Sequence, residues 1–137
     1  MPDGLRLEAD AWLRRAHDDL GAARKLLSGS DPFPATAAYH CQQAAEKALK
    51  ALIASTGKPV PKMHDLRALI AQCTQIETRL AALHEACEEL TPYATEFRYP
   101  TDNRDPELAE VACAIVMAAE IVTAIATTID ERLPGSH

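Results

Sequence analysis

The chain has 137 residues, the size of one typical domain, and its formal net charge is −6. This acidic balance excludes broad electrostatic affinity for nucleic acid, which depends on clustered Lys and Arg, but it permits a local basic pocket. Apolar residues make up 47% of the chain and aromatic residues only 4%. Because much of the apolar content is alanine, the composition favours closely packed helices over sheets.

Missing patterns exclude several kinds of site and location. No uninterrupted run of about 18 apolar residues occurs, so we predict no membrane span. The first residues lack the basic and apolar segments of a signal peptide. The four cysteines are widely spaced without a C-x-x-C pair, which predicts reduced core residues and no metal site. Reduced cysteines predict a cytoplasmic protein. Since a glycine-rich phosphate loop and an H-E-x-x-H pattern are also absent, we expect no cofactor.

The first predicted helix runs from about Leu5 to Leu27, and Gly29 follows its end. Its apolar residues recur at steps of three and four and mark the face expected to enter the core: Ala9, Trp12, Leu13, Ala16, Leu20, Ala23 and Leu27. We interpret the single tryptophan as a core anchor rather than a platform for stacking a base. The adjacent acids Asp18 and Asp19 are interpreted as part of a solvated face.

A second helix is predicted from Pro34 to about Ser55. At about 100° per residue, four polar residues gather on one side of this helix, and we name them the polar stripe: His40, Gln43, Lys47 and Lys50. One imidazole, one amide and two ammonium groups suit an anion with hydrogen-bonding edges, such as a nucleotide. The alternative is an ordinary solvated face, in which Glu46 and Lys50 form an i,i+4 pair.

The third predicted helix is short and follows a proline-stiffened loop. It runs from His64 to about Cys73. The imidazole at its start can cap the helix, bind a ligand, or act as an acid or base. The next residue, Asp65, is a residue that the helix dipole favours in this position in any protein.

A fourth helix and a loop are predicted next. Thr74 and Glu77 have the spacing of a capping box, which predicts that they open the fourth helix. Residues 95–104 show no periodicity and are predicted to form a loop. In it, Arg98 can grip a phosphate through two hydrogen bonds, and Tyr99 offers a ring face and a hydroxyl. The alternative is that Arg98 only bridges carboxylates of neighbouring helices.

The last predicted helix has an unusually wide apolar surface. Asp105 supplies an N-cap and Pro106 a first-turn proline. Its main apolar register has heptad spacing: Leu108, Ala112, Ile115, Ala119, Val122, Ala126, Ile129 and Leu133. Further apolar residues lie beside this seam: Val111, Ala118, Ile121 and Ile125. Because this surface is too wide for one intramolecular seam, we predict a homodimer.

These elements predict an all-α bundle that forms a single domain over residues 1–137, with an ordered core at about 5–133. Motifs follow one another along nearly the whole chain: Ala11-Trp12-Leu13, Ala16, Asp19-Leu20, Ala22-Ala23, Leu26-Leu27, Tyr39-His40, Gln42-Gln43-Ala44, Glu46-Lys47-Ala48-Leu49-Lys50-Ala51, Gly57, His64-Asp65-Leu66 and Arg98-Tyr99-Pro100. In this order and at these intervals, the motifs resemble the HEPN family, a small helical domain of prokaryotes and higher eukaryotes.

The resemblance implies a fold and a set of partners. The fold is an up-and-down bundle of four main helices plus one short helix, usually assembled as a homodimer. The implied role is linked to nucleotides or RNA. The resemblance also implies frequent pairing with a minimal nucleotidyltransferase encoded next door, in which one protein acts as a toxin and the other as its antitoxin.

One departure from the family concerns catalysis. HEPN ribonucleases carry an arginine followed four to six residues later by a histidine, near the start of the final helix. Neither Arg98 nor Arg104 is followed by histidine at that distance. Arg132 and His137 have the spacing, but Pro134-Gly135 breaks the helix between them. A metal-independent ribonuclease would therefore lack its expected general acid or base.

Two functions remain open. The leading hypothesis is a homodimeric binding module without ribonuclease activity, which holds a nucleotide or RNA end or docks a nucleotidyltransferase. Its functional surface is predicted to comprise the polar stripe together with His64, Arg98 and Tyr99. The alternative is a ribonuclease toxin that uses Arg132 and His137, or an unconventional histidine such as His64 or His40.

Overall fold

The computed structural model describes residues 2–96 and 105–134, and these residues form helices without any strand. Five are α-helices: α1 (Pro2–Leu27), α2 (Pro34–Ser55), α3 (Leu66–Ile76), α4 (His84–Leu90) and α5 (Leu108–Arg132). Two 3-10 helices flank α4: η1 (Thr78–Leu83) and η2 (Thr91–Ala94). The predicted all-α bundle is confirmed.

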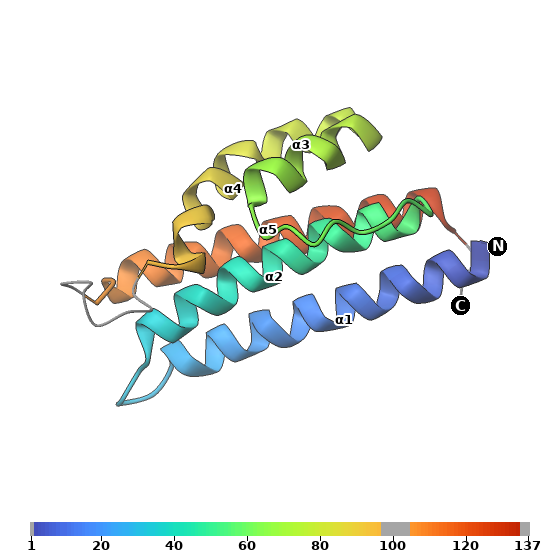
Figure 1. Ribbon diagram of the computed structural model, residues 1–137. Helices are drawn as coiled ribbons and strands as arrows, with labels where there is room; N and C mark the ends of the chain where they lie inside the picture. The colour runs from blue at the N-terminus through green and yellow to red at the C-terminus, as the bar shows by residue number, and fades with distance from the viewer. Residues whose placement is uncertain (1, 97–104, 135–137) are drawn as a thin grey trace.

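Three long helices form the body of the bundle. α1, α2 and α5 lie side by side, and α1 runs antiparallel to the other two (Figure 1). α3 and α4 form a second layer over α2 and α5, on the side away from α1. α1 begins where α5 ends, and there Arg6 Nη1 donates a 3.1 Å hydrogen bond to the carbonyl oxygen of Leu133. The segment between α2 and α3 runs back along α2, which brings the residues before α3 beside the middle of that helix.

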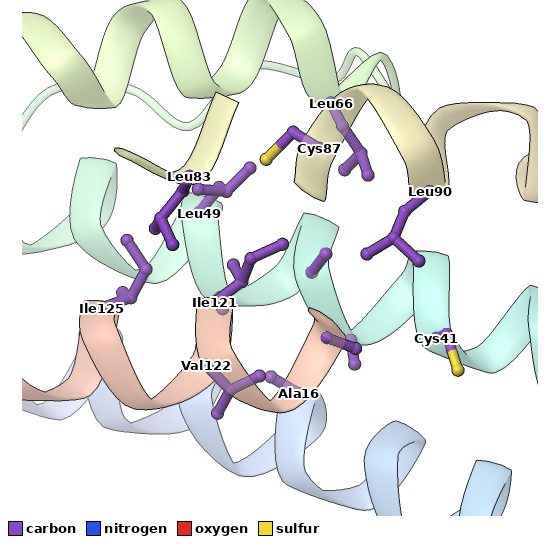
Figure 2. Close-up of a cluster of buried hydrophobic side chains, with 14 of the residues drawn as sticks. Ala16, Cys41, Leu49, Leu66, Leu83, Cys87, Leu90, Ile121, Val122 and Ile125 are labelled. Carbon is purple, nitrogen blue, oxygen red and sulfur yellow. The ribbon is translucent and has the colours of Figure 1, made fainter. Parts of the chain in front are cut away.

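Small side chains let α1 and α2 approach each other closely. Fully buried alanines from the two helices include Ala9, Ala16, Ala23, Ala37, Ala44, Ala45 and Ala48. Larger apolar side chains fill the space between the long helices and the second layer. Figure 2 shows Leu49 of α2, Ile121 and Ile125 of α5 and Leu83 of η1 in one cluster. The high helix propensity of alanine and this division of side-chain size explain why an aromatic-poor chain forms a packed bundle.

The predicted core register of α5 is wrong at most positions. The buried residues of this helix are Val111, Ala114, Ala118, Ile121, Val122, Ile125, Thr128 and Ile129. Of the predicted heptad seam, only Val122 and Ile129 are among them, whereas Leu108 is 50% exposed. Because α5 is apolar nearly all the way around, hydrophobic spacing does not fix which side turns inward.

By length and composition, α5 could also cross a membrane. Glu120 interrupts the apolar run of this helix, so the sequence did not predict a membrane span there. The property is weak evidence for a membrane span, since the core helix of a soluble protein passes the same test. However, only 33% of the most apolar part of α5 is buried in the bundle. Two of its large apolar side chains, Leu108 and Val116, are 50% and 58% exposed.

The start of α3 differs from the prediction. The helix begins at Leu66, and Asp65 is its N-cap. The Oδ1 atom of Asp65 accepts a 3.0 Å hydrogen bond from the backbone N–H of Arg67, as a capping carboxylate does. His64 therefore precedes the helix and does not open it, which leaves its side chain available for other contacts.

Two predicted helix caps are also wrong. Thr74 lies inside α3, where its hydroxyl donates a 2.8 Å hydrogen bond to the carbonyl four residues earlier. A threonine bonded in this way does not end the helix, and Glu77 instead caps η1. The N-cap of α5 is Glu107 rather than Asp105, because Glu107 can form a capping box with the acid three residues later.

Three of the four cysteines are core residues, as predicted, and Cys113 is the exposed exception. Burial raises the pKa of the Cys41, Cys73 and Cys87 thiols to about 12. Because the thiolate is the reactive form, we expect a folded Cys113→Ser variant to show no fast reaction with Ellman's reagent in mildly alkaline buffer. Three thiols should react after unfolding in urea. Fast reaction of any thiol in the folded variant would contradict this arrangement.

Candidate functional site

Asp19 of α1 holds two members of the polar stripe. Its assignment to a solvated face is wrong, because the residue is only 8% exposed. Asp19 Oδ1 lies 2.8 Å from His40 Nδ1, and Oδ2 accepts a 2.6 Å hydrogen bond from Lys47 Nζ. Both partners come from α2, so this carboxylate ties α1 and α2 together. The charge of Lys47 is therefore largely compensated within the bundle.

Glu46 of α2 forms a second and more deeply buried cluster. The residue is 4% exposed, and its Oε2 atom lies 3.2 Å from Lys50 Nζ and 2.9 Å from His64 Nδ1. Oε1 accepts a 3.3 Å hydrogen bond from Gln42 Nε2. The ammonium group of Lys50 also lies 5.8 Å from the ring centroid of Trp12, a cation–π distance. Both carboxylate oxygens of Glu46 are thus bonded to groups of the bundle.

A pocket of about 240 Å³ opens beside these clusters. Its walls come from α2, the segment before α3 and the end of η2: Tyr39, Gln43, His64, Ala94 and Thr95. The η2 wall is anchored to α5 because the Tyr93 hydroxyl donates a 2.8 Å hydrogen bond to Glu110 Oε2. Burial, reinforced by this hydrogen bond, raises the pKa of Tyr93, so the hydroxyl stays a donor over the physiological pH range.

Buried polar groups position the polar walls of the pocket. The ring of His40 meets that of Tyr39 edge to face, with centroids 5.8 Å apart and an interplanar angle of 72°. Gln43 Nε2 donates a 2.7 Å hydrogen bond to Gln42 Oε1. Gln42 Nε2 in turn lies 3.2 Å from the carbonyl oxygen of His64. Tyr39, Gln43 and His64 therefore each contact a neighbouring side chain.

The structure brings only some residues of the predicted site together. Gln43 and His64 meet in the pocket, although 21 positions separate them in sequence. Lys50 does not join them, because its side chain is 5% exposed and faces Trp12 and Glu46. The predicted contributions of Arg98 and Tyr99 lie outside the described residues.

The alternative catalytic pair falls at the end of α5. Arg132 is exposed in the last turn of that helix. The helix ends there, and His137 lies outside the described residues. In the part of the chain that the structure describes, no three His, Cys, Asp or Glu residues are placed to hold a metal ion.

Sequence reasoning missed three residues that build the site. Tyr39 and Gln42 flank residues of the polar stripe but were not assigned to the surface. Asp19 was missed although a signal was present. It follows Trp12 and Ala16 at steps of seven and three, which places it on the inward face of α1. A carboxylate in that register must find partners inside the bundle.

The outer face of α5 forms a second candidate surface, which we name the α5 groove. It has a volume of about 740 Å³ and is lined by Arg24, Leu83, Ile115, Val116, Ala119, Glu120, Thr123 and Ala124. Val116 in this groove is 58% exposed. An exposed apolar helix face of this kind marks an interaction surface.

The fold and the pocket define a small helical module with carboxylate-held imidazoles beside a polar pocket. The model of the family described as "HEPN domain" matches residues 9–128, and the chain belongs to this family. The predicted resemblance to HEPN domains is therefore confirmed. A search of curated proteins finds no match to the chain.

Two solved structures support the assignment of the fold. The protein TT1696 from Thermus thermophilus is similar with a TM-score of 0.75 and 28% identity, over 88% of this chain and 97% of that one. ST0689, an archaeal HEPN homologue, is similar with a TM-score of 0.70 and 23% identity, over 89% of this chain and 98% of that one. The second likeness shows the fold alone.

Proposed function

We propose that this protein is a HEPN binding module that holds a nucleotide or the end of an RNA in the pocket of Tyr39, Gln43 and His64. The observation that carries the proposal is the pre-organisation of these three side chains by contacts from the bundle. Groups that are already fixed lose little conformational freedom when a ligand binds. Membership of the HEPN family is consistent with a role linked to nucleotides or RNA.

His64 is the group that gives the pocket affinity for an anion or an acceptor. Its side chain is 73% exposed while Nδ1 is bonded to Glu46, which directs Nε2 away from that carboxylate. When the imidazole is protonated, Nε2–H can donate a charge-assisted hydrogen bond to a ligand. With Lys47 and Lys50 paired inside the bundle and a net charge of −6, long nucleic acid gains little non-specific attraction.

The module is proposed to act as a homodimer through the α5 groove. Support comes from the 33% burial of the most apolar part of α5 and from the exposure of Leu108 and Val116. A second copy is a suitable occupant because the groove carries one cation, Arg24, and one anion, Glu120. A two-fold axis can bring each charge opposite its complement on the partner. A stable interface of this kind should bury more than about 1,000 Å².

We further propose a minimal nucleotidyltransferase as partner, in a toxin–antitoxin-like pair. The support is the family resemblance, and a homodimer formed through α5 leaves the pocket side of α2 exposed for docking. The test is the neighbouring reading frame in the genome. A small nucleotidyltransferase encoded there should co-elute with this protein after co-expression, and separate elution would contradict the pairing.

A second candidate function is favoured by one contact. The 2.9 Å contact between Glu46 and His64 orients an exposed imidazole by a buried carboxylate, as in many general acid–base sites. This arrangement supports the alternative of a ribonuclease that uses His64. A second catalytic group facing the pocket is required as well, and the other polar side chains among the described wall residues are Tyr39, Gln43 and Thr95.

Binding is tested by calorimetry with mononucleotides and short single-stranded RNA. We expect His64→Ala to weaken binding by about 10- to 150-fold, since loss of one charge-assisted hydrogen bond costs about 1.5–3 kcal/mol. His84→Ala is the matched control, because His84 is an exposed histidine on α4 outside the pocket. Absence of binding by the wild-type protein, or equal binding by both variants, would contradict the proposal.

The same variants separate the two candidate functions. We expect the pure wild-type protein to leave a mixed RNA pool intact. Degradation that is lost in His64→Ala and kept in His84→Ala would replace the binding module with the ribonuclease.

A further inference from the structure

We infer that the nucleobase of the ligand enters the pocket and that the phosphates stay outside it. This inference rests on the proposed function and names the chemical group that the pocket recognises. Charge, size and hydrogen-bonding groups support it separately.

The charges around the pocket disfavour a buried phosphate. No lysine or arginine is present in its described lining. Lys47 Nζ is held 2.6 Å from Asp19, and the Lys50 side chain is 5% exposed and bonded to Glu46. A phosphate that left water for this pocket would lose hydration, and among the described lining residues His64 is its one potential cation, which is unfavourable. A neutral base has no such cost.

The size of the pocket fits a ring system rather than a whole nucleotide. Its volume is about 240 Å³, below the range of roughly 300–1,000 Å³ that is typical of pockets for drug-sized ligands. A heterocyclic base fits such a space, whereas ribose and phosphates would extend past Thr95 and His64 at the rim. His64, an exposed polar wall, can then contact the sugar.

The hydrogen-bonding groups match the edge of a nucleobase. Gln43 has two N–H donors and one carbonyl acceptor, and one N–H is used on Gln42 Oε1 at 2.7 Å. The remaining donor and acceptor are adjacent on one amide, and glutamine pairs in a bidentate way with a base edge that has a donor beside an acceptor, as adenine N6 and N7 do. Tyr39 adds an aromatic wall whose ring is braced edge to face by His40. An aromatic wall beside a fixed amide is a typical base-binding pair.

The experiment is a ligand series on the wild-type protein followed by one variant. Adenosine, AMP, the other three nucleosides and inorganic pyrophosphate are titrated by calorimetry. We expect adenosine and AMP to bind with dissociation constants within about tenfold of each other, a difference of no more than about 1.4 kcal/mol. Pyrophosphate should not bind. Gln43→Leu should weaken adenosine at least tenfold.

Gln75→Leu is the matched control, because Gln75 is exposed on α3 outside the pocket and should not change binding. If AMP and pyrophosphate bind but adenosine does not, the base assignment is overturned while the proposed function stands. If Gln43→Leu binds adenosine as the wild type does, the amide contact is overturned. If no nucleotide or nucleoside binds, the inference and the proposed function both fail.

Discussion

Replacing Glu46 with Gln is expected to destabilise the bundle by about 3–5 kcal/mol, because it leaves the buried charge of Lys50 without its anion. The pair is 5% exposed on both sides, so water cannot take over the role of the lost partner. His64 would also lose the carboxylate that orients its ring. Urea unfolding followed by circular dichroism measures the change in unfolding free energy.

Two controls test whether the loss of stability comes from the unpaired charge of Lys50. The double variant Glu46→Gln/Lys50→Met removes both charges and should recover most of the lost stability, since an uncharged pair no longer needs compensation. Removal of the Arg67–Glu88 pair, in which each side chain is 57% exposed, should change stability by less than about 1 kcal/mol. Equal effects of the buried and the exposed pair would show that Lys50 reaches water in solution.

Local sequence signals predicted the parts of the fold that depend on one helix at a time. α2 begins at Pro34 and ends at Ser55, as predicted. A first-turn proline and the loop after residue 55 act through backbone geometry alone. Trp12 packs against the core, as its place in the apolar register of α1 indicates. The family resemblance was also recognisable, since it depends on the order of short motifs.

The rest depends on contacts between helices, which periodicity does not specify. Helical spacing placed Lys47 and Lys50 on the same side of α2, but it could not show that α1 covers part of that side. Inside the bundle, Asp19 pairs with the ammonium group of Lys47 and Glu46 with that of Lys50. The predicted core-facing side of α5 was wrong for a related reason. A helix that is apolar all the way around fits the core in several orientations.

Replacing Val116 with Lys is expected to dissociate the proposed homodimer, weakening self-association by at least about a hundredfold. The side chain is 58% exposed in the α5 groove, and a charge there would be buried against apolar residues of the second copy. The variant should remain folded, because the new ammonium group lies four residues from Glu120 on the same helix face. Light scattering over a micromolar concentration series gives the mass of each variant.

The matched control is Leu7→Lys, since Leu7 is 72% exposed on α1 and lies outside the groove. If the wild type and Leu7→Lys are dimeric and Val116→Lys is monomeric, the interface lies on α5.

Charge reversal then tests the geometry of the dimer. Arg24→Glu and Glu120→Arg should each weaken it, and the double variant should restore it, because a two-fold axis repeats every contact. A monomeric wild type at micromolar concentration would refute the homodimer, and a dimeric Val116→Lys would move the interface away from the groove.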